Sequence, residues 1–287
     1  VGTRLGVKIL AREMIHEGII DDIRRGLPVI QANLLAYDEC AHRRGPQSPF
    51  AHRSLRSIDN MVASLDRFIR RKAPDYTLIL YSDHGQEQVI PYRRQKGSPF
   101  AVQVENLWKS HLQSPDRPSI EYAKLIVCDK GPLGHIYFPW KMTSQEEAQF
   151  ARSVASILPG AGVLHKDDTG RVYFSDAEQT KKLTESINRI LTPNHPFFNE
   201  VSADLEKLIC HQDAGDLIAL GWQSGQRPTS FPDENGAHAG PGEEETEAFL
   251  LAPPEWIPEK KSLRPRDLYS YWRGKLFPKS PAQHSWE

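Results

Sequence analysis

The 287-residue chain has few cysteines, no long apolar run and almost no net charge, and each absence excludes a class of protein. Three cysteines (Cys40, Cys128 and Cys210) are too few for a disulfide framework, and their spacing matches no zinc-binding motif. No apolar run approaches the ~20 residues that span a bilayer, so we expect no transmembrane segment in this sequence. A formal net charge of −1 gives no overall field that would attract nucleic acid or an anionic membrane.

The start of the sequence lacks both a methionine and a signal-peptide pattern. The first residue is Val1, and a helical pattern over Thr3 to Arg25 follows at once. We therefore expect the chain to be an N-terminally truncated part of a longer protein. The oligomeric state and the cellular location stay open, because a membrane anchor or an export signal in the missing part would make the protein membrane-associated or extracytoplasmic.

Apolar runs of strand length alternate with helical patterns in the first third of the chain. The run "PVIQANLLAY" ends at Asp38, a helical pattern covers Leu55 to Phe68, and the run "YTLILYS" follows. Strand, helix and strand in this order form a βαβ unit, which implies parallel strands. We predict one α/β domain over residues 1–287, doubly wound, with a mostly parallel central sheet and helices on both faces. Two strand pairs in residues 121–174 predict a small β-hairpin insertion.

Carboxylates and histidines cluster where the two predicted strands end. Asp38 and His42 lie in "DECAH", Asp83 and His84 lie in "DHG", and His238 lies in a polar loop before a later strand. In an open parallel sheet, ligands bind at the carboxyl ends of the strands. Carboxylate and imidazole groups together suit Zn²⁺ and similar ions. Five such groups are more ligands than one tetrahedral metal site with an open position can use. They would supply most of the ligands of a two-metal site of the kind used in phosphoryl transfer.

Each motif also has a plainer interpretation when it is taken alone. An Asp-His pair can cap a helix or a turn, and a histidine in a glycine-rich loop is commonly a surface residue. Ser82 is interpreted as the last residue of its strand rather than as a nucleophile, and "GEEETE" as the solvated acidic edge of a loop. Gly85 allows the backbone to turn sharply and to approach a ligand closely. The order, the strand-end placement and the glycines together favour the metal site.

Three stretches carry a resemblance to a known family. "YDECAHRRGP" resembles the PD-x-x-G-H-x-x-G-P stretch of the type I phosphodiesterases and nucleotide pyrophosphatases, in the alkaline phosphatase superfamily. "YSDHGQ" is similar to their S-D-H-G-M stretch, and "NGAHAG" to their late G-x-H-G histidine. The resemblance implies an alkaline phosphatase-like fold and metal-dependent hydrolysis of phosphate mono- or diesters. It implies two divalent ions, zinc or alternatively manganese, of which one is held by Asp38, His42 and His238 and the other by Asp83 and His84.

The sequence departs from the family pattern at two places. In the family, a further Asp ligand and a Thr or Ser nucleophile precede the opening helix, and nothing from Val1 to Ile30 matches them. The nucleophile is therefore expected upstream of Val1, and the chain itself is expected to be weakly active or inactive. Ala239 stands where the family has glycine, which is a mild change unless the backbone needs a positive φ there. The expected substrate is a small phosphorylated molecule. A sulfatase, a phosphotransferase or a catalytically incomplete metal-binding module remain as alternatives.

Overall fold

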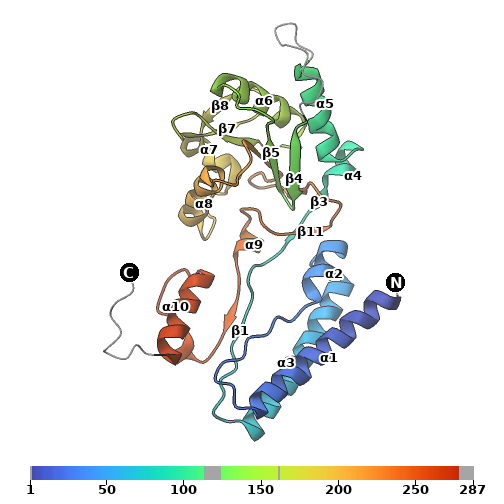
Figure 1. Ribbon diagram of the computed structural model, residues 1–287, viewed down its shortest axis with the longest axis vertical. Coiled ribbons are helices and arrows are strands. Elements are labelled where there is room, and N and C mark those ends of the chain that lie inside the picture. Colours follow the sequence, from blue (N-terminus) through green and yellow to red (C-terminus); the bar gives the residue numbers. More distant parts are fainter. Residues whose placement is uncertain (1, 113–123, 161, 278–287) are drawn as a thin grey trace.

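The computed structural model describes residues 2–112, 124–160 and 162–277, which form an α/β fold (Figure 1). The helices are α1 (Gly2–Arg24), α2 (Tyr37–Arg44), α3 (Pro49–Lys72), α4 (Tyr92–Lys96), α5 (Phe100–Leu112), α6 (Ser144–Ile157), α7 (Leu183–Ile190), α8 (Phe198–Cys210), α9 (Glu243–Thr246), the 3₁₀ turn η1 (Pro254–Trp256) and α10 (Pro265–Leu276). The strands are β1 (Leu80–Tyr81), β2 (Glu87–Gln88), β3 (Ile90–Pro91), β4 (Ile126–Lys130), β5 (Leu133–Tyr137), β6 (Val163–Lys166), β7 (Val172–Ser175), β8 (Thr180–Lys182), β9 (Leu217–Leu220), β10 (Thr229–Ser230), β11 (Gly236–Ala237) and β12 (Leu250–Leu251). None of the described helices has the length and apolar composition that crossing a membrane requires.

The main sheet has six strands in the order β4-β5-β9-β6-β7-β8. All four residues of its central strand β9 are buried. Leu217 and Ala219 pack into one apolar cluster with residues of α5 and α6. Ile218 and Leu220 pack into a second cluster with residues of α7 and α8. Because successive side chains of a strand point to opposite faces, helices cover both faces of this sheet, as predicted.

The prediction of a mostly parallel central sheet is wrong. Every pairing in the six-stranded sheet is antiparallel, and within the described ranges the one parallel pair is the short β3–β10 contact. Residues 29–35 form no strand, and the run 76–82 contributes only β1, which pairs antiparallel with β12. A continuous apolar run signals burial on both faces of a strand. β9 is buried in this way within an antiparallel sheet. An apolar run therefore does not determine whether a strand pairs parallel or antiparallel.

The two hairpins expected in residues 121–174 are present, with residues 121–123 and 161 outside the described part. β4 pairs with β5, and β6 pairs with β7 around a turn that ends at Gly170. Together they supply four of the six strands of the main sheet. They therefore belong to the body of the fold that supports the site.

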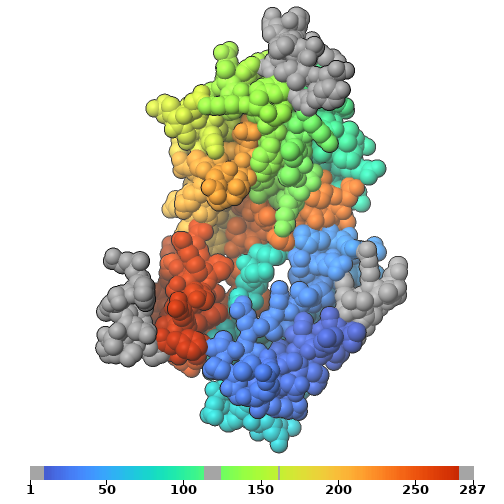
Figure 2. Space-filling model, in the orientation of Figure 1, coloured from blue at the N-terminus to red at the C-terminus, as the bar shows by residue number. Residues whose placement is uncertain are grey.

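Short contacts join this sheet to the other half of the molecule. Helices α1, α3 and α10 lie at the end far from the main sheet, and α2, α9 and β11 lie between the two halves (Figure 1). β11 pairs with β2 and contacts α2. Figure 2 shows orange residues, from the later part of the sequence, packed against the light blue residues around α2. This junction brings together the segments that carry the candidate site.

Candidate metal centre

Helix α2 carries the first two predicted ligands. Asp38 lies in its first turn and His42 in its last turn, so the helix dipole favours both charges. At a spacing of four residues the two side chains share one face of the helix. Asp38 Oδ1 lies 3.2 Å from His42 Nε2. Asp38 is thus positioned by a helix and not by the end of a strand, contrary to the prediction, because the chain enters α2 without forming a strand beforehand.

His84 and His238 reach the same place from two other segments. His238 follows β11, and its Nε2 lies 3.5 Å from Asp38 Oδ1. Its ring centroid lies 3.7 Å from that of His84 and 5.0 Å from that of His42. Asp38, His84 and His238 each offer one ligand atom within 4.8 Å of the others. These three residues form a group that could hold a metal ion.

Asp83 lies at the margin of this group. Its Oδ1 is 3.7 Å from His84 Nε2 and accepts a hydrogen bond from the backbone N–H of His84. Its side chain is 77% exposed, the most open of the five predicted ligands. All five side chains therefore gather in one region, and the resemblance implied that they divide into two sets. That division stays a prediction.

Oxygen atoms lie next to the Nδ1 atoms of two of these histidines. His84 Nδ1 lies 2.7 Å from the carbonyl oxygen of Gly85. His42 Nδ1 lies 2.7 Å from Glu234 Oε2, although the ring N–H is not directed along that line. The other oxygen of Glu234 accepts a hydrogen bond from the hydroxyl of the buried Ser230. An acceptor at Nδ1, as at His84, fixes the ring and leaves Nε2 available as a ligand.

Sequence reasoning missed two residues that contact the ligands. Glu234 lies in "DENGAH", four residues before His238, and its proximity in sequence is the one signal that could have found it. The carboxylate of Glu39, which is closer to His42 in sequence, lies 3.4 Å from Arg43 Nε instead. Gln86 donates a hydrogen bond from Nε2 to Asp38 Oδ1 at 3.3 Å. Both missed residues hold ligands in place from outside the group.

The carboxylates in the centre favour a positive charge among the histidines. The carboxylates of Asp38 and Glu234 beside its ring raise the pKa of His42 to about 10. The hydrogen bond from His42 lowers the pKa of Asp38. Burial and the neighbouring imidazole of His84 lower the pKa of His238. The carboxylates thus stabilise one positive charge among the imidazoles, and either a proton or a divalent ion can supply it.

Two strained alanines flank the centre. Among the described non-glycine residues, Ala36 (φ 108°) and Ala239 (φ 84°) have positive φ. Ala36 precedes α2, and Ala239 follows His238 directly. Such conformations cost L-residues free energy and persist where the surrounding structure imposes them, often at functional sites. The alanine at position 239 is therefore not a mild change, because the backbone there does adopt a positive φ.

Gly85 is required by close packing and not by a turn. A Cβ atom at this position would lie 1.9 Å from the carbonyl oxygen of Glu244. The backbone N–H of Gly85 donates to the carbonyl oxygen of Glu245 at 2.8 Å. The glycine after His84 thus lets two backbone segments meet beside the centre.

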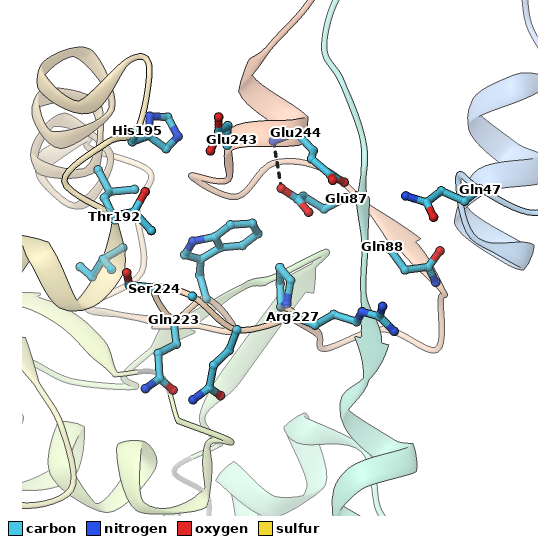
Figure 3. A pocket seen from close by; sticks show the side chains of 16 residues that line it. Gln47, Glu87, Gln88, Thr192, His195, Gln223, Ser224, Arg227, Glu243 and Glu244 are labelled. Atoms are coloured by element: carbon cyan, nitrogen blue, oxygen red, sulfur yellow. Dashed lines mark hydrogen bonds between the residues drawn. The ribbon is translucent and has the colours of Figure 1, made fainter.

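A cavity of about 350 Å³ lies next to the centre, and β2 forms part of its wall (Figure 3). Its lining includes Glu87, His195, Trp222, Arg227 and Glu244, and none of the five predicted ligands. Burial, followed by the charge of Glu244, raises the pKa of Glu87 to about 7. The cavity is therefore a separate feature from the centre.

Comparison with known proteins gives a family match and matches to solved structures. Residues 29–236 match the family described as type I phosphodiesterase / nucleotide pyrophosphatase. Two structures of murine ectonucleotide pyrophosphatase / phosphodiesterase 5 match with TM-scores of 0.45; one, an inactive variant in complex with AMP, is 19% identical, and the other is 18% identical. Each match covers 83% of this chain and 51% of the murine chain, so the chain spans about half the length of these proteins. No curated protein sequence gives a significant match.

Proposed function

The chain belongs to the type I phosphodiesterase / nucleotide pyrophosphatase family, and on that premise we propose that it forms the metal-binding part of a hydrolase that cleaves phosphate esters. The proposed site holds two divalent ions. Asp38, His42 and His238 bind one of them, and Asp83 and His84 bind the other. The substrate is a small phosphate ester, for which the family description favours a nucleotide.

The convergence of Asp38, His84 and His238 from three separate segments carries this proposal. One carboxylate among imidazoles is a donor set that suits zinc, whereas manganese prefers sites richer in oxygen. The donor set therefore fits the ion that the family resemblance implies, and zinc is proposed ahead of manganese. Glu234 beside His42 supplies the outer contact that metal-binding histidines usually have.

The residues of the chain have distinct parts in the proposed reaction. Two bound divalent ions would neutralise phosphate charge and stabilise the attacking and leaving oxygens. Glu234 orients His42, and Gln86 holds Asp38 by a hydrogen bond. Ser82 is not proposed as the nucleophile, because its hydroxyl accepts a hydrogen bond from Phe249 N at 3.1 Å beside the β1–β12 pair. No covalent nucleophile is assigned within the chain.

The exposure of Asp83 favours a second candidate function. With this carboxylate 77% exposed and outside the compact group, one ion bound near Asp38, His84 and His238 satisfies the geometry. The chain would then be a metal-binding module without hydrolytic activity of its own.

Zinc titration combined with a hydrolysis assay tests both candidates. The 287-residue chain is titrated with zinc by calorimetry and then assayed on an activated aryl phosphodiester, with and without a chelator. His238→Ala is the test variant, and His52→Ala, which removes an exposed histidine of α3, is the matched control.

We expect zinc to bind wild type and His52→Ala alike, and His238→Ala much more weakly. Hydrolysis that needs zinc and is lost in His238→Ala would support the hydrolase. Zinc binding without hydrolysis by this chain would favour the metal-binding module. A chain that binds no zinc, or that hydrolyses the ester equally well in chelator, would contradict the proposed two-metal function.

A further inference from the structure

Glu245 is a buried carboxylate that lies outside the proposed set of ligands. Its side chain is in α9, and the residue is only 4% exposed, although it stands in a run of three glutamates. Its Oε2 accepts a hydrogen bond from Gly240 N at 2.7 Å, and its Oε1 accepts one from Gly242 N at 3.0 Å. A buried carboxylate is tolerated when its oxygens are hydrogen-bonded in this way. These bonds fix the loop that begins just after His238.

The backbone of the same residue holds a second segment. The carbonyl oxygen of Glu245 accepts a hydrogen bond from Gly85 N at 2.8 Å. Gly85 directly follows His84, and its lack of a side chain permits this approach, since a Cβ would lie 1.9 Å from Glu244 O. Glu245 is therefore bonded on one side to the segment that follows His238 and on the other side to the segment that follows His84.

Helix α9 is held in place by further bonds on the cavity side. The backbone N–H of Glu244 donates to Glu87 Oε1 at 3.0 Å, which Figure 3 draws as a dashed line between the two residues. The Thr246 hydroxyl donates to the carbonyl oxygen of Gly242 and lies 3.5 Å from His195 Nε2. A helix of one turn has no stability of its own. Its position, and hence that of Glu245, is set by these contacts with the surrounding fold.

We infer that Glu245 is a positioning residue that sets the separation of His84 and His238 and thereby the metal affinity of the centre. The inference rests on the proposed function for its metal, but the geometry it explains is present in the chain itself: the two rings stack with centroids 3.7 Å apart. Each ring lies next to a segment that Glu245 binds. Moving either segment would separate the rings and take one Nε2 away from Asp38.

A purely structural role for Glu245 would lower stability without a selective effect on the centre. The test therefore compares metal affinity with stability. Glu245→Gln keeps the size of the side chain but replaces one acceptor oxygen by an NH₂ group, which cannot accept from a backbone N–H. Glu247→Gln, an exposed residue just beyond α9, is the matched control. Ile209→Val, a change in the apolar cluster beside α8, is the control for general destabilisation and costs about 1 kcal/mol.

Zinc affinity is measured for each 287-residue variant by competition with a chromophoric chelator, below its unfolding temperature. We expect Glu245→Gln to weaken zinc binding by roughly 10–100-fold, as changes in outer contacts of metal ligands do. Glu247→Gln and Ile209→Val should bind like wild type. In the metal-free chain, the ring resonances of His84 and His238 should shift in Glu245→Gln, while those of His52 should not.

The outcomes separate this inference from the proposed function. A wild type that binds no zinc would defeat the proposed function, and the ring resonances of the metal-free chain would still decide the positioning role. Equal zinc affinity of wild type and Glu245→Gln, or unshifted rings, would overturn the inference alone. An equal loss of affinity in Ile209→Val would also overturn it. If Glu245→Gln does not fold, Glu245→Asp replaces it in the same test. The shorter side chain of aspartate cannot reach both N–H groups, so the same results are expected.

Discussion

The imidazole rings of His84 and His238 stack almost face to face, with their centroids 3.7 Å apart and their planes inclined by 20°. Two protonated rings at this separation would repel each other strongly. The stack therefore disfavours two imidazolium rings, so at least one ring is a neutral imidazole that can bind a metal. Burial and the nearby His84 lower the pKa of His238, which favours the neutral form of its ring that binds a metal.

Removal of either stacked ring should weaken metal binding strongly. We expect His84→Ala and His238→Ala each to lower zinc affinity by more than the roughly 10–100-fold that outer contacts contribute. Because the two rings stack against each other, the double variant should lose less than the sum of the two single losses in binding free energy. Calorimetry on the four proteins measures this coupling. Strict additivity would show that the contact between the two rings does not couple their metal binding.

The Ala239→Gly variant should be more stable than wild type. Ala239 has a φ of 84°, and a left-handed conformation costs a non-glycine residue about 1–2 kcal/mol. Glycine removes this cost, so we expect the free energy of unfolding to rise by about 1 kcal/mol in urea denaturation. The matched control is Ala148→Gly inside α6, where the same change should lower stability by about 0.5–1 kcal/mol. Equal effects of both changes would contradict the strain assigned to Ala239.

The Gly85→Ala variant should damage both the fold and the centre. Its Cβ would lie 1.9 Å from Glu244 O, a backbone atom that cannot move without displacing α9. We expect a loss of stability of at least about 1–3 kcal/mol, as in overpacked cores, together with weaker zinc binding. Gly18→Ala provides the control, because a Cβ in this helical position meets nothing within 4 Å. There the same substitution should stabilise the chain by up to about 1 kcal/mol.

Stability should fall in mild acid because of a buried histidine away from the centre. Burial is the main cause that lowers the pKa of His165 to about 4 from its ordinary 6.5. Between these values the unfolded chain binds more protons than the folded chain, so the free energy of unfolding rises with pH across this window. From pH 7 to pH 4 the loss should reach up to about 3 kcal/mol.

Urea denaturation at a series of pH values, with a chelator present, measures this effect. His165→Gln should flatten the profile between about pH 4 and 6.5, and His52→Gln should leave it unchanged. A constant difference in the free energy of unfolding between wild type and His165→Gln across this range would show that His165 keeps its ordinary pKa in the folded chain.

The proximity of Asp38 to His42 could be predicted from the sequence because their spacing is local. Asp38 and His42 are four residues apart in the sequence. On α2, as on any helix, this spacing places both side chains on one face. Their convergence with His84 was expected from the strand-end rule, which gave the right meeting place for a wrong reason. The observed junction is made by α2, β2 and β11, and not by neighbouring parallel strands.

Glu245 shows what the sequence could not reveal. It stands among Glu243, Glu244 and Glu247, and the whole stretch has the composition of a solvated loop. Three of these four glutamates are exposed, and the fourth is buried. Within a single helical turn no repeated pattern marks the inward side. Its burial is decided by Gly240, Gly242 and Gly85, which lie close in space but not all in sequence.

The long stretch of chain between Asp38 and His238 links metal binding to the amount of folded protein in the cell. Closing a loop of that length costs roughly 5 kcal/mol of chain entropy, so the two side chains meet only once both halves of the molecule have folded. An ion bound between them would be bound by the folded chain alone. Every tenfold excess of such an ion over its dissociation constant would then add about 1.4 kcal/mol to stability. Cells short of the metal would hold less of the protein, because more of it would be unfolded and open to proteolysis.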